Sequence, residues 1–318
     1  MRVLVVGAGA MGGYFGGRLA EKGEDVTFLV RPGRQQQLKE TGLVIKSVHG
    51  DFRSPVNTIT SGDPCEPFDL VLLTVKAYHL DGAVPSIKPY IHEQTMILPL
   101  LNGIRHMETL WQHFPEKNVL GGLGFIETTL NQRGEIEQYS AIHDIVFGEW
   151  DETETSRIKQ VEKLFQGAKM GARSSRKIQL EMWKKYLFIS AMSGMTCLMR
   201  SSIGPILSSP YGRETYQAFL DELYSVAVLR EPRLSSDLPE KILANTARLE
   251  PTMKSSMLRD MEKGLPIETD HFHGTLIEWA QKGQKLPILK AVYSALSIYQ
   301  EQQKNRTTEN DRQQTSIS

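Results

Sequence analysis

The chain has 318 residues, with 37 basic and 37 acidic side chains. Hydrophobic residues make up 40% and charged residues 23%, a composition typical of a folded globular protein, which excludes a disordered or fibrous chain. This length suggests about two domains. The net charge of zero argues against a nucleic-acid partner, because phosphate contacts need a basic excess.

The two cysteines, Cys65 and Cys197, are far apart and give neither a disulfide framework nor the spacing of metal ligands. Met1-Arg2 leads directly into the apolar run 3–6, which leaves no room for a signal peptide. The longest nearly apolar run, 186–199, is short for a membrane span and suits a buried helix. We therefore expect a cytoplasmic protein with no membrane partner.

In the first half of the chain, short apolar runs alternate with helical segments or loops. Such alternation predicts a Rossmann-type, doubly wound parallel sheet covered by helices on both faces. The predicted strands are residues 3–6, 26–30, 70–75, 95–100 and 118–120.

Residues 136–139 and 142–147 follow Gly134 and predict a short hairpin or two added strands, with Gly134 at the turn. The charged segment 151–163 predicts an exposed helix.

Glycines, serines and basic residues between 167 and 177 indicate a domain boundary. Helical periods dominate after Ile178. We expect an α/β domain at 1–170, an all-α domain at 171–300, and a polar, disordered tail at 301–318.

A glycine-rich turn, Gly7-Ala8-Gly9-Ala10-Met11-Gly12, joins the first predicted strand to a helix, and a second strand follows. In this context Gly7 permits a tight turn, Gly9 lets the backbone approach a pyrophosphate, and Gly12 lets helix and strand pack closely. The helix N-terminus offers free N–H groups to the phosphates. The turn predicts dinucleotide binding; the alternative is a structural glycine turn.

The second strand ends without the Asp or Glu that commonly binds the ribose of NAD. Arg31 and Arg34 follow instead, and guanidinium groups suit the 2′-phosphate of NADP(H). Two solvated surface arginines are the alternative. We find no further segments for FAD and no phosphate-loop signature.

Two later strands lead to polar residues, Lys76 and Asn102, where ligands of open α/β sheets bind. Lys76 could hold a phosphate or a ribose oxygen, and Asn102 could bind nicotinamide or substrate. A surface lysine and an Asn-Gly turn are equally consistent with position alone.

In the helical half, Lys185 shares a helix face with Ile189, Ser193 and Thr196. A lysine on such a face is partly desolvated, which lowers its pKa and eases proton donation. The alternative is a lysine that extends to water from the helix end.

A second candidate group follows a segment that predicts a helix starting at Ser255-Ser256 and stopping at Gly264. Pro266 predicts a new helix with Glu268 in its first turn, and a carboxylate on an apolar face needs a partner. Lys185 is the candidate. Asp270, His271 and His273 lack a further ligand set, so we expect no metal.

These segments together resemble the ketopantoate reductase (2-dehydropantoate 2-reductase) family over nearly the whole chain. The resemblance rests on GAGAMG, VKAYH around Lys76, LNG around Asn102, MWKKY around Lys185, SSMLRDMEKG around Ser256 and PIETD around Glu268. It implies a Rossmann domain, a helical domain, and reduction of 2-dehydropantoate to (R)-pantoate by NADPH, a step towards pantothenate and coenzyme A.

The resemblance also implies roles for single residues. Lys185 and Glu268 are the catalytic pair, and Glu268 is also expected to contact the cofactor. Asn102, Ser193 and Ser256 bind substrate. The cofactor-binding residues are Gly7, Gly9, Ala10, Met11, Gly12, Arg31, Lys76 and Asn102.

Two positions depart from the family pattern. Many members carry asparagines one and two turns after the catalytic lysine, where this chain has Ile189 and Ser193. Isoleucine cannot hydrogen-bond to a substrate, and a lost polar contact changes substrate preference. A reductase of another branched 2-oxo acid therefore stays open. A non-catalytic NADP(H)-binding sensor is a separate alternative, and the presence of Lys185 and Glu268 argues against it, because cofactor binding alone requires neither. The partner is a small 2-oxo acid, and a homodimer is compatible with the sequence.

Overall fold

The computed structural model describes the backbone of residues 1–315 and the side chains of residues 1–305. The chain forms two compact units, Met1–Met182 and Trp183–Ser318, and passes from one to the other within helix α6 (Ile178–Met199). The expected boundary at residue 170 lies before this division and stays a prediction.

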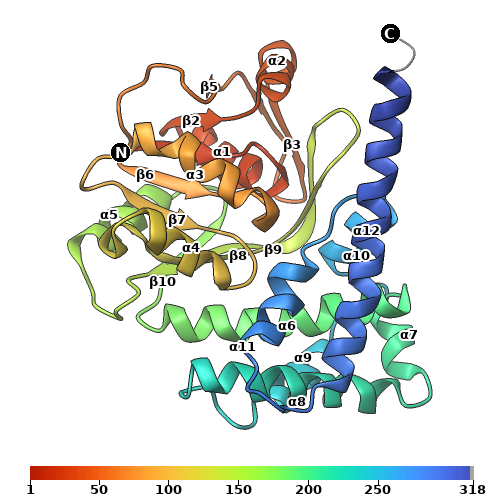
Figure 1. The fold of residues 1–318 in the computed structure, drawn as a ribbon. Helices are drawn as coiled ribbons and strands as arrows, with labels where there is room; N and C mark the ends of the chain where they lie inside the picture. Colours follow the sequence, from red (N-terminus) through yellow and green to blue (C-terminus); the bar gives the residue numbers. More distant parts are fainter. Residues whose placement is uncertain (316–318) are drawn as a thin grey trace. The chain divides into compact units, whose positions relative to one another are not determined.

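The first unit is built on a five-stranded parallel sheet (Figure 1). Its strands are β1 (Arg2–Val6), β2 (Asp25–Leu29), β5 (Asn57–Ile59), β6 (Leu70–Leu73) and β7 (Met96–Pro99). Their order is β5-β2-β1-β6-β7, and each neighbouring pair is parallel. Strand order therefore reverses direction at β1, the doubly wound arrangement that the sequence predicts.

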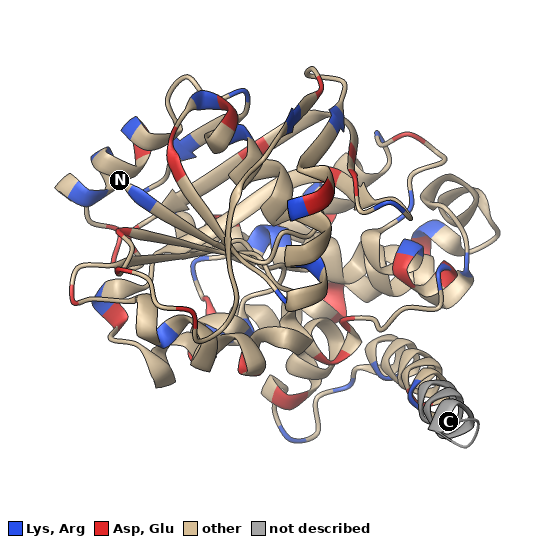
Figure 2. Cartoon of the chain, turned by 90° about the horizontal axis from the view of Figure 1, so that it is seen from above, with Lys and Arg blue, Asp and Glu red and all other residues tan. Residues whose placement is uncertain are grey.

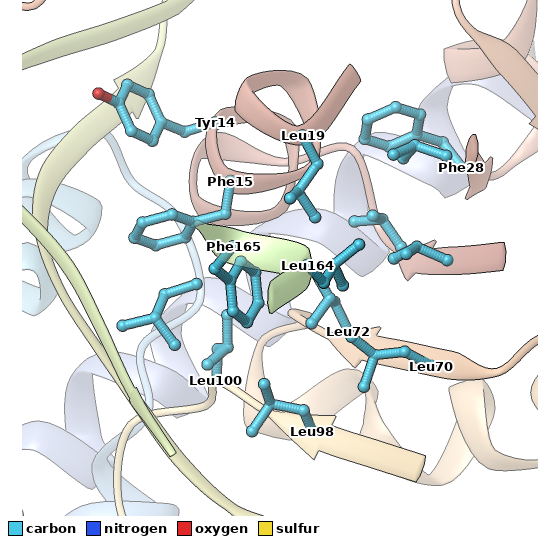
Figure 3. Packing of buried hydrophobic residues seen from close by; sticks show 14 of the residues in the cluster. Tyr14, Phe15, Leu19, Phe28, Leu70, Leu72, Leu98, Leu100, Leu164 and Phe165 are labelled. Atoms are coloured by element: carbon cyan, nitrogen blue, oxygen red, sulfur yellow. The ribbon is translucent and has the colours of Figure 1, made fainter. Parts of the chain in front are cut away.

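Side chains on both faces of this sheet are buried. Val3, Val5, Leu70 and Leu72 belong to the cluster that includes residues of two helices, α1 (Ala10–Lys22) and α5 (Ser156–Phe165) (Figure 3). Their alternate neighbours, such as Leu4, are fully buried as well. Because successive side chains of a strand point to opposite faces, both faces must be covered, which is why these strands are almost continuously apolar.

A second, mixed sheet of the same unit was not predicted. It contains β3 (Leu43–Ser47), β4 (Phe52–Ser54), β8 (Gly121–Leu130), β9 (Ile136–Gly148) and β10 (Gly171–Ser174). The hairpin prediction was partly wrong, because residues 136–139 and 142–147 both belong to β9. Gly134, with φ +72°, does lie at the turn, but the turn joins β8 to β9.

Helix α1 packs closely because it carries glycine where other residues would collide. A Cβ on Gly16 would lie 2.7 Å from Val5 of the parallel sheet, and a Cβ on Gly17 would lie 2.6 Å from Ile45 of the mixed sheet. The glycine pairs of this helix therefore let it approach both sheets, beyond what nucleotide binding requires.

Two further predictions need correction. Residues 118–120 form no separate strand: a short 3₁₀ turn, η3 (Glu116–Asn118), leads into one isolated bridge between Val119 and Ile97. The helix expected to be exposed begins later, at Ser156, and buries Ile158 and Val161. The many charged residues of this segment drew attention away from its apolar residues, which recur with helical spacing and form one buried face.

The remaining helices of the first unit are α2 (Pro32–Thr41), α3 (Leu80–Ile87) and α4 (Arg105–His113), with short 3₁₀ turns η1 (Ala77–His79) and η2 (Lys88–Tyr90). The second unit is helical as predicted. It contains α6, α7 (Ile203–Ser208), α8 (Gly212–Arg230), α9 (Leu238–Thr246), α10 (Ser256–Glu262), η4 (Asp270–Gly274), α11 (Thr275–Trp279) and α12 (Pro287–Thr315).

The polar end of the chain differs from the expectation of disorder. Residues 301–315 continue helix α12, while 316–318 lie outside the described residues. Glutamine, glutamate, lysine and arginine are good helix formers, so a helix that is already packed can extend into a polar segment.

Basic and acidic residues are interspersed along the elements of each unit (Figure 2). Among the described residues, no helix is long and apolar enough to cross a membrane.

Candidate functional site

The glycine-rich turn lies at the carboxyl end of β1 and is held by the neighbouring strands. Gly7 adopts φ +94°, which favours glycine, and its N–H donates to Leu29 O at 3.0 Å. A Cβ on Gly12 would lie 2.1 Å from Thr74 Oγ1 and 2.2 Å from Gly7 O. Gly7 and Gly12 thus have the conformational and packing roles that the sequence predicts.

The N-terminus of α1 is left open for an anion. Gly9 is its N-cap, no described side chain caps it, and its first turn has no acidic residue. The first intrahelical bond runs from Gly13 N to Gly9 O at 2.8 Å, so the amides of Ala10, Met11 and Gly12 have no acceptor within the helix. A Cβ on Gly9 would meet no described atom within 4 Å. These residues fit the pyrophosphate of a dinucleotide.

Arg31 is exposed at the end of β2, where it is the N-cap of α2. Its Nη2 lies 3.3 Å from both ring nitrogens of His79, which follows β6. Sequence reasoning did not single out His79. The VKAYH segment is its only signal, and that segment was read for Lys76.

Arg34, which the sequence offered as a second phosphate ligand, is used within the protein. Its Nε donates to Ala8 O at 3.2 Å, and its Nη1 donates to Gly134 O at 2.9 Å and Gln37 Oε1 at 2.6 Å. Burial lowers the pKa of Arg34 from its usual value. Arg34 therefore ties the glycine-rich turn to the β8–β9 turn.

Lys76 and Asn102 follow β6 and β7, so both lie beyond the carboxyl edge of the parallel sheet, as the glycine-rich turn and Arg31 do. Both side chains are partly buried. The structure therefore brings these predicted residues to one edge of one sheet, where open α/β sheets bind ligands.

Thr74 was not predicted, and it holds the turn in place. Its Oγ1 lies 2.8 Å from Val6 O and 3.1 Å from Gly7 O, to which its hydroxyl donates. The signal was a polar residue directly after the buried strand β6.

In the second unit, helix α6 and the segment before η4 carry Lys185 and Glu268. Lys185 is partly buried and Glu268 is 6% exposed. Burial lowers the pKa of Lys185 to about 8, and the negative charge of Glu268 opposes this shift. The two groups therefore interact within one unit, as expected for a partly desolvated ammonium with a carboxylate partner.

Glu268 lies just before the helical segment, whereas the sequence predicts it inside the first turn. It precedes η4 rather than occupying the first turn of a helix, and its backbone O accepts from Phe272 N at 3.0 Å. Pro266 is accordingly outside the helix. The turn at Gly264, with φ +69°, ends α10 as predicted.

The two predicted substrate serines differ in exposure: Ser193 is 3% exposed and Ser256 is exposed at the start of α10. Ser255 is the N-cap of α10, with its Oγ accepting from Leu258 N at 3.0 Å. The Thr196 and Ser255 hydroxyls lie 2.7 Å apart. This contact joins the end of α6 to the start of α10, and so connects the elements that carry Ser193 and Ser256.

The lowered pKa of Lys185 predicts a pH dependence. If the protonated amine acts as an acid, kcat/KM of the reaction that it serves is constant at low pH and falls about tenfold per unit above pH 8. Because Glu268 raises that pKa, Glu268→Gln should move the decline to lower pH. Initial rates between pH 6 and 10 measure both; a profile unchanged in Glu268→Gln would contradict the pairing.

A parallel sheet whose glycine-rich turn fits a dinucleotide, together with a lysine–carboxylate pair in a helical unit, is typical of one class, the Rossmann-fold oxidoreductases.

Comparison with known proteins places the chain within this class. The family models Ketopantoate reductase PanE/ApbA and Ketopantoate reductase PanE/ApbA C terminal match residues 3–152 and 177–300. The chain belongs to the ketopantoate reductase family, and it is an oxidoreductase of that family.

Two related sequences illustrate the range of similarity. An uncharacterized oxidoreductase, YkpB of Bacillus subtilis, is 46% identical over 303 residues, which cover 94% of this chain and 99% of that protein. The 2-dehydropantoate 2-reductase of Nostoc is 24% identical, covering 92% of this chain and 93% of its own.

Solved structures of known proteins are also similar to this chain over most of its length. The 2-dehydropantoate 2-reductase of Geobacter metallireducens has a TM-score of 0.85 at 27% identity, covering 93% of this chain and 99% of that one. A D-mandelate dehydrogenase solved with NADH and anilino(oxo)acetate has a TM-score of 0.86 at 20% identity, covering 96% of this chain and 100% of that one. The latter likeness shows the shared fold.

Proposed function

We propose that the protein reduces 2-dehydropantoate to (R)-pantoate with NADPH, a step of pantothenate and coenzyme A biosynthesis. The observation that carries this proposal is the pairing of Lys185 with Glu268 in a chain of the ketopantoate reductase family. The Nostoc and Geobacter metallireducens relatives bear the name of this activity.

In the proposed mechanism, Lys185 acts on the ketone oxygen. Its ammonium donates a proton to this oxygen, or stabilises the negative charge that develops there, as the carbonyl carbon accepts hydride. If Lys185 donates the proton, it is left neutral and regains a proton from water; if it only stabilises the charge, it stays protonated and water supplies the proton to the alkoxide. Bound NADPH supplies the hydride.

The other residues orient these groups. Glu268 holds the ammonium and accepts a hydrogen bond from a substrate hydroxyl. Asn102, Ser193 and Ser256 bind the substrate, and Lys76 binds the cofactor. A pKa near 8 suits Lys185 to this role, because it is protonated at neutral pH yet gives up its proton more readily than an ordinary lysine.

The choice of NADPH rests on Arg31. It is exposed beyond β2 with no acidic residue beside it in the sequence 29–34, so its guanidinium suits a 2′-phosphate. Arg31→Ala should raise the KM for NADPH at least about tenfold and leave the KM for NADH nearly unchanged, since one charge-assisted hydrogen bond is worth about 1.5–3 kcal/mol. Equal kcat/KM of the native enzyme with both cofactors would count against this assignment.

A second substrate class is favoured by one residue. Ile189 follows Lys185 by one helical turn and cannot donate or accept a hydrogen bond through its side chain. A site with this residue suits a 2-oxo acid that has an apolar group where 2-dehydropantoate has a polar one. The 46% identical relative is itself an oxidoreductase of unassigned substrate.

Turnover across a panel of 2-oxo acids tests the proposal. The panel contains 2-dehydropantoate and branched 2-oxo acids that lack its hydroxyl, each assayed by NADPH oxidation. We expect the highest kcat/KM for 2-dehydropantoate; a place among the poorest substrates would favour the second class. NADPH binding without turnover of any 2-oxo acid would instead favour the sensor hypothesis. Assembly as a homodimer stays a prediction.

A further inference from the structure

Two buried hydrogen bonds join helix α6 to the segment that follows Glu268. Tyr186, next to Lys185, donates through its hydroxyl to Phe272 O at 2.6 Å. His273, which is fully buried, lies with Nε2 2.9 Å from Ser190 O. Both contacts connect the element that carries Lys185 with the element that Glu268 precedes.

The partners of His273 determine its protonation. A backbone carbonyl can only accept, so Nε2 carries the proton that is donated to Ser190 O. Nδ1 then accepts from the Thr269 hydroxyl, whose Oγ1 lies 3.0 Å away. Burial lowers the pKa of His273 to about 4, which keeps the ring neutral near pH 7. Both ring nitrogens are therefore used, and one of their partners is the residue next to Glu268.

The surrounding backbone is shaped to let this contact form. A Cβ on Gly194 would lie 2.9 Å from His273 Nε2 and 2.7 Å from Phe219, so glycine leaves room for the ring beside α6. The η4 segment is a π-helical turn, in which Thr275 N–H donates to Asp270 O, five residues earlier. Such turns occur frequently at functional sites.

We propose that His273 is a positioning residue that holds Glu268 against Lys185 by fixing Thr269 and Ser190 to each other. The ring connects the residue after Glu268 with the helix that bears Lys185. Tyr186 provides the second connection, because Phe272 also donates its N–H to Glu268 O. This inference rests on the proposed function in taking Lys185 and Glu268 as the reacting pair.

The test follows the ionisation of Lys185, which needs no substrate. Protein labelled with ¹³C-lysine is titrated by NMR, and the Lys185 signal is identified by its loss in Lys185→Arg. We expect a midpoint near pH 8 in the native protein. In His273→Leu, Glu268 loses its fixed position and attracts the ammonium less, so the midpoint should fall by about half a unit or more.

Matched variants separate positioning from packing. His273→Gln can still donate to Ser190 O and should restore most of the native midpoint. His271→Leu, the same change two residues earlier at a partly exposed position, should leave the midpoint unchanged. An unchanged midpoint in folded His273→Leu would overturn the proposal.

If His273→Leu does not fold, the same titration of Thr269→Val tests the proposal instead. This substitution removes the hydroxyl but keeps the side-chain shape, and it should shift the midpoint in the same direction by less; no shift would overturn the proposal. Because the titration is made without a 2-oxo acid, a wrong substrate assignment would appear in the turnover panel and leave this result intact.

Discussion

Replacing Lys185 with alanine should lower kcat about 10³-fold while NADPH still binds with nearly native affinity. The variant loses the proton donor and the cation that stabilises charge on the ketone oxygen, and losses of such groups cost about 10²–10⁴ in rate. The glycine-rich turn and Arg31 belong to the other compact unit and are unchanged. Steady-state rates give kcat, and NADPH fluorescence gives the affinity.

Lys184→Ala is the matched control, because Lys184 is exposed and adjacent in sequence. It removes the same charge from the same helix and should keep nearly native kcat. A Lys185→Ala enzyme with native turnover would remove Lys185 from its proposed role.

Replacing Gly9 with alanine should weaken NADPH binding by roughly 10–100-fold, because the added methyl group keeps the pyrophosphate from the amides at the start of α1. This range corresponds to the loss of about one charge-assisted hydrogen bond. The fold should be intact, since Gly9 has φ −79° and a Cβ there meets no described atom within 4 Å. Fluorescence titration and thermal unfolding measure the two properties.

Gly82→Ala is the control for the effect of adding a methyl group to a glycine away from the turn. Gly82 is exposed in α3, and a Cβ there would also meet no described atom within 4 Å. This substitution should leave NADPH affinity unchanged. Gly12→Ala provides the contrast, because its Cβ would collide with Thr74 and Gly7, and it should lower the melting temperature as well. Native NADPH affinity in Gly9→Ala would show that the phosphates do not approach this turn.

The parallel sheet could be predicted because its strands are buried on both faces and therefore read as continuous apolar runs, as in Leu70–Leu73. The mixed sheet could not be predicted, nor could β5, the edge strand of the parallel sheet. β4 and β5 have only three residues each, and Phe52–Ser54 is partly polar, so neither forms an apolar run. β4 is a strand because it pairs with β3, and β5 because it pairs with β2, rather than because of their own residue pattern.

The candidate site, like the fold, could be predicted from the sequence only in part. Gly7, Gly12 and the Lys185–Glu268 pair could be proposed from residue type and spacing. The use of Arg34 could not be predicted, because its partners Ala8 and Gly134 meet it only in the folded sheet. His273 was considered only as a metal ligand, since sequence does not show that its ring faces Ser190 O.

The most direct measurement is the distance between Lys185 Nζ and the ketone oxygen in a crystal structure of the enzyme with NADP⁺ and 2-dehydropantoate. The proposed mechanism predicts a hydrogen bond of about 2.6–3.2 Å, with Glu268 beside the same ammonium. A ketone oxygen bound by other groups, with Lys185 out of reach, would contradict it.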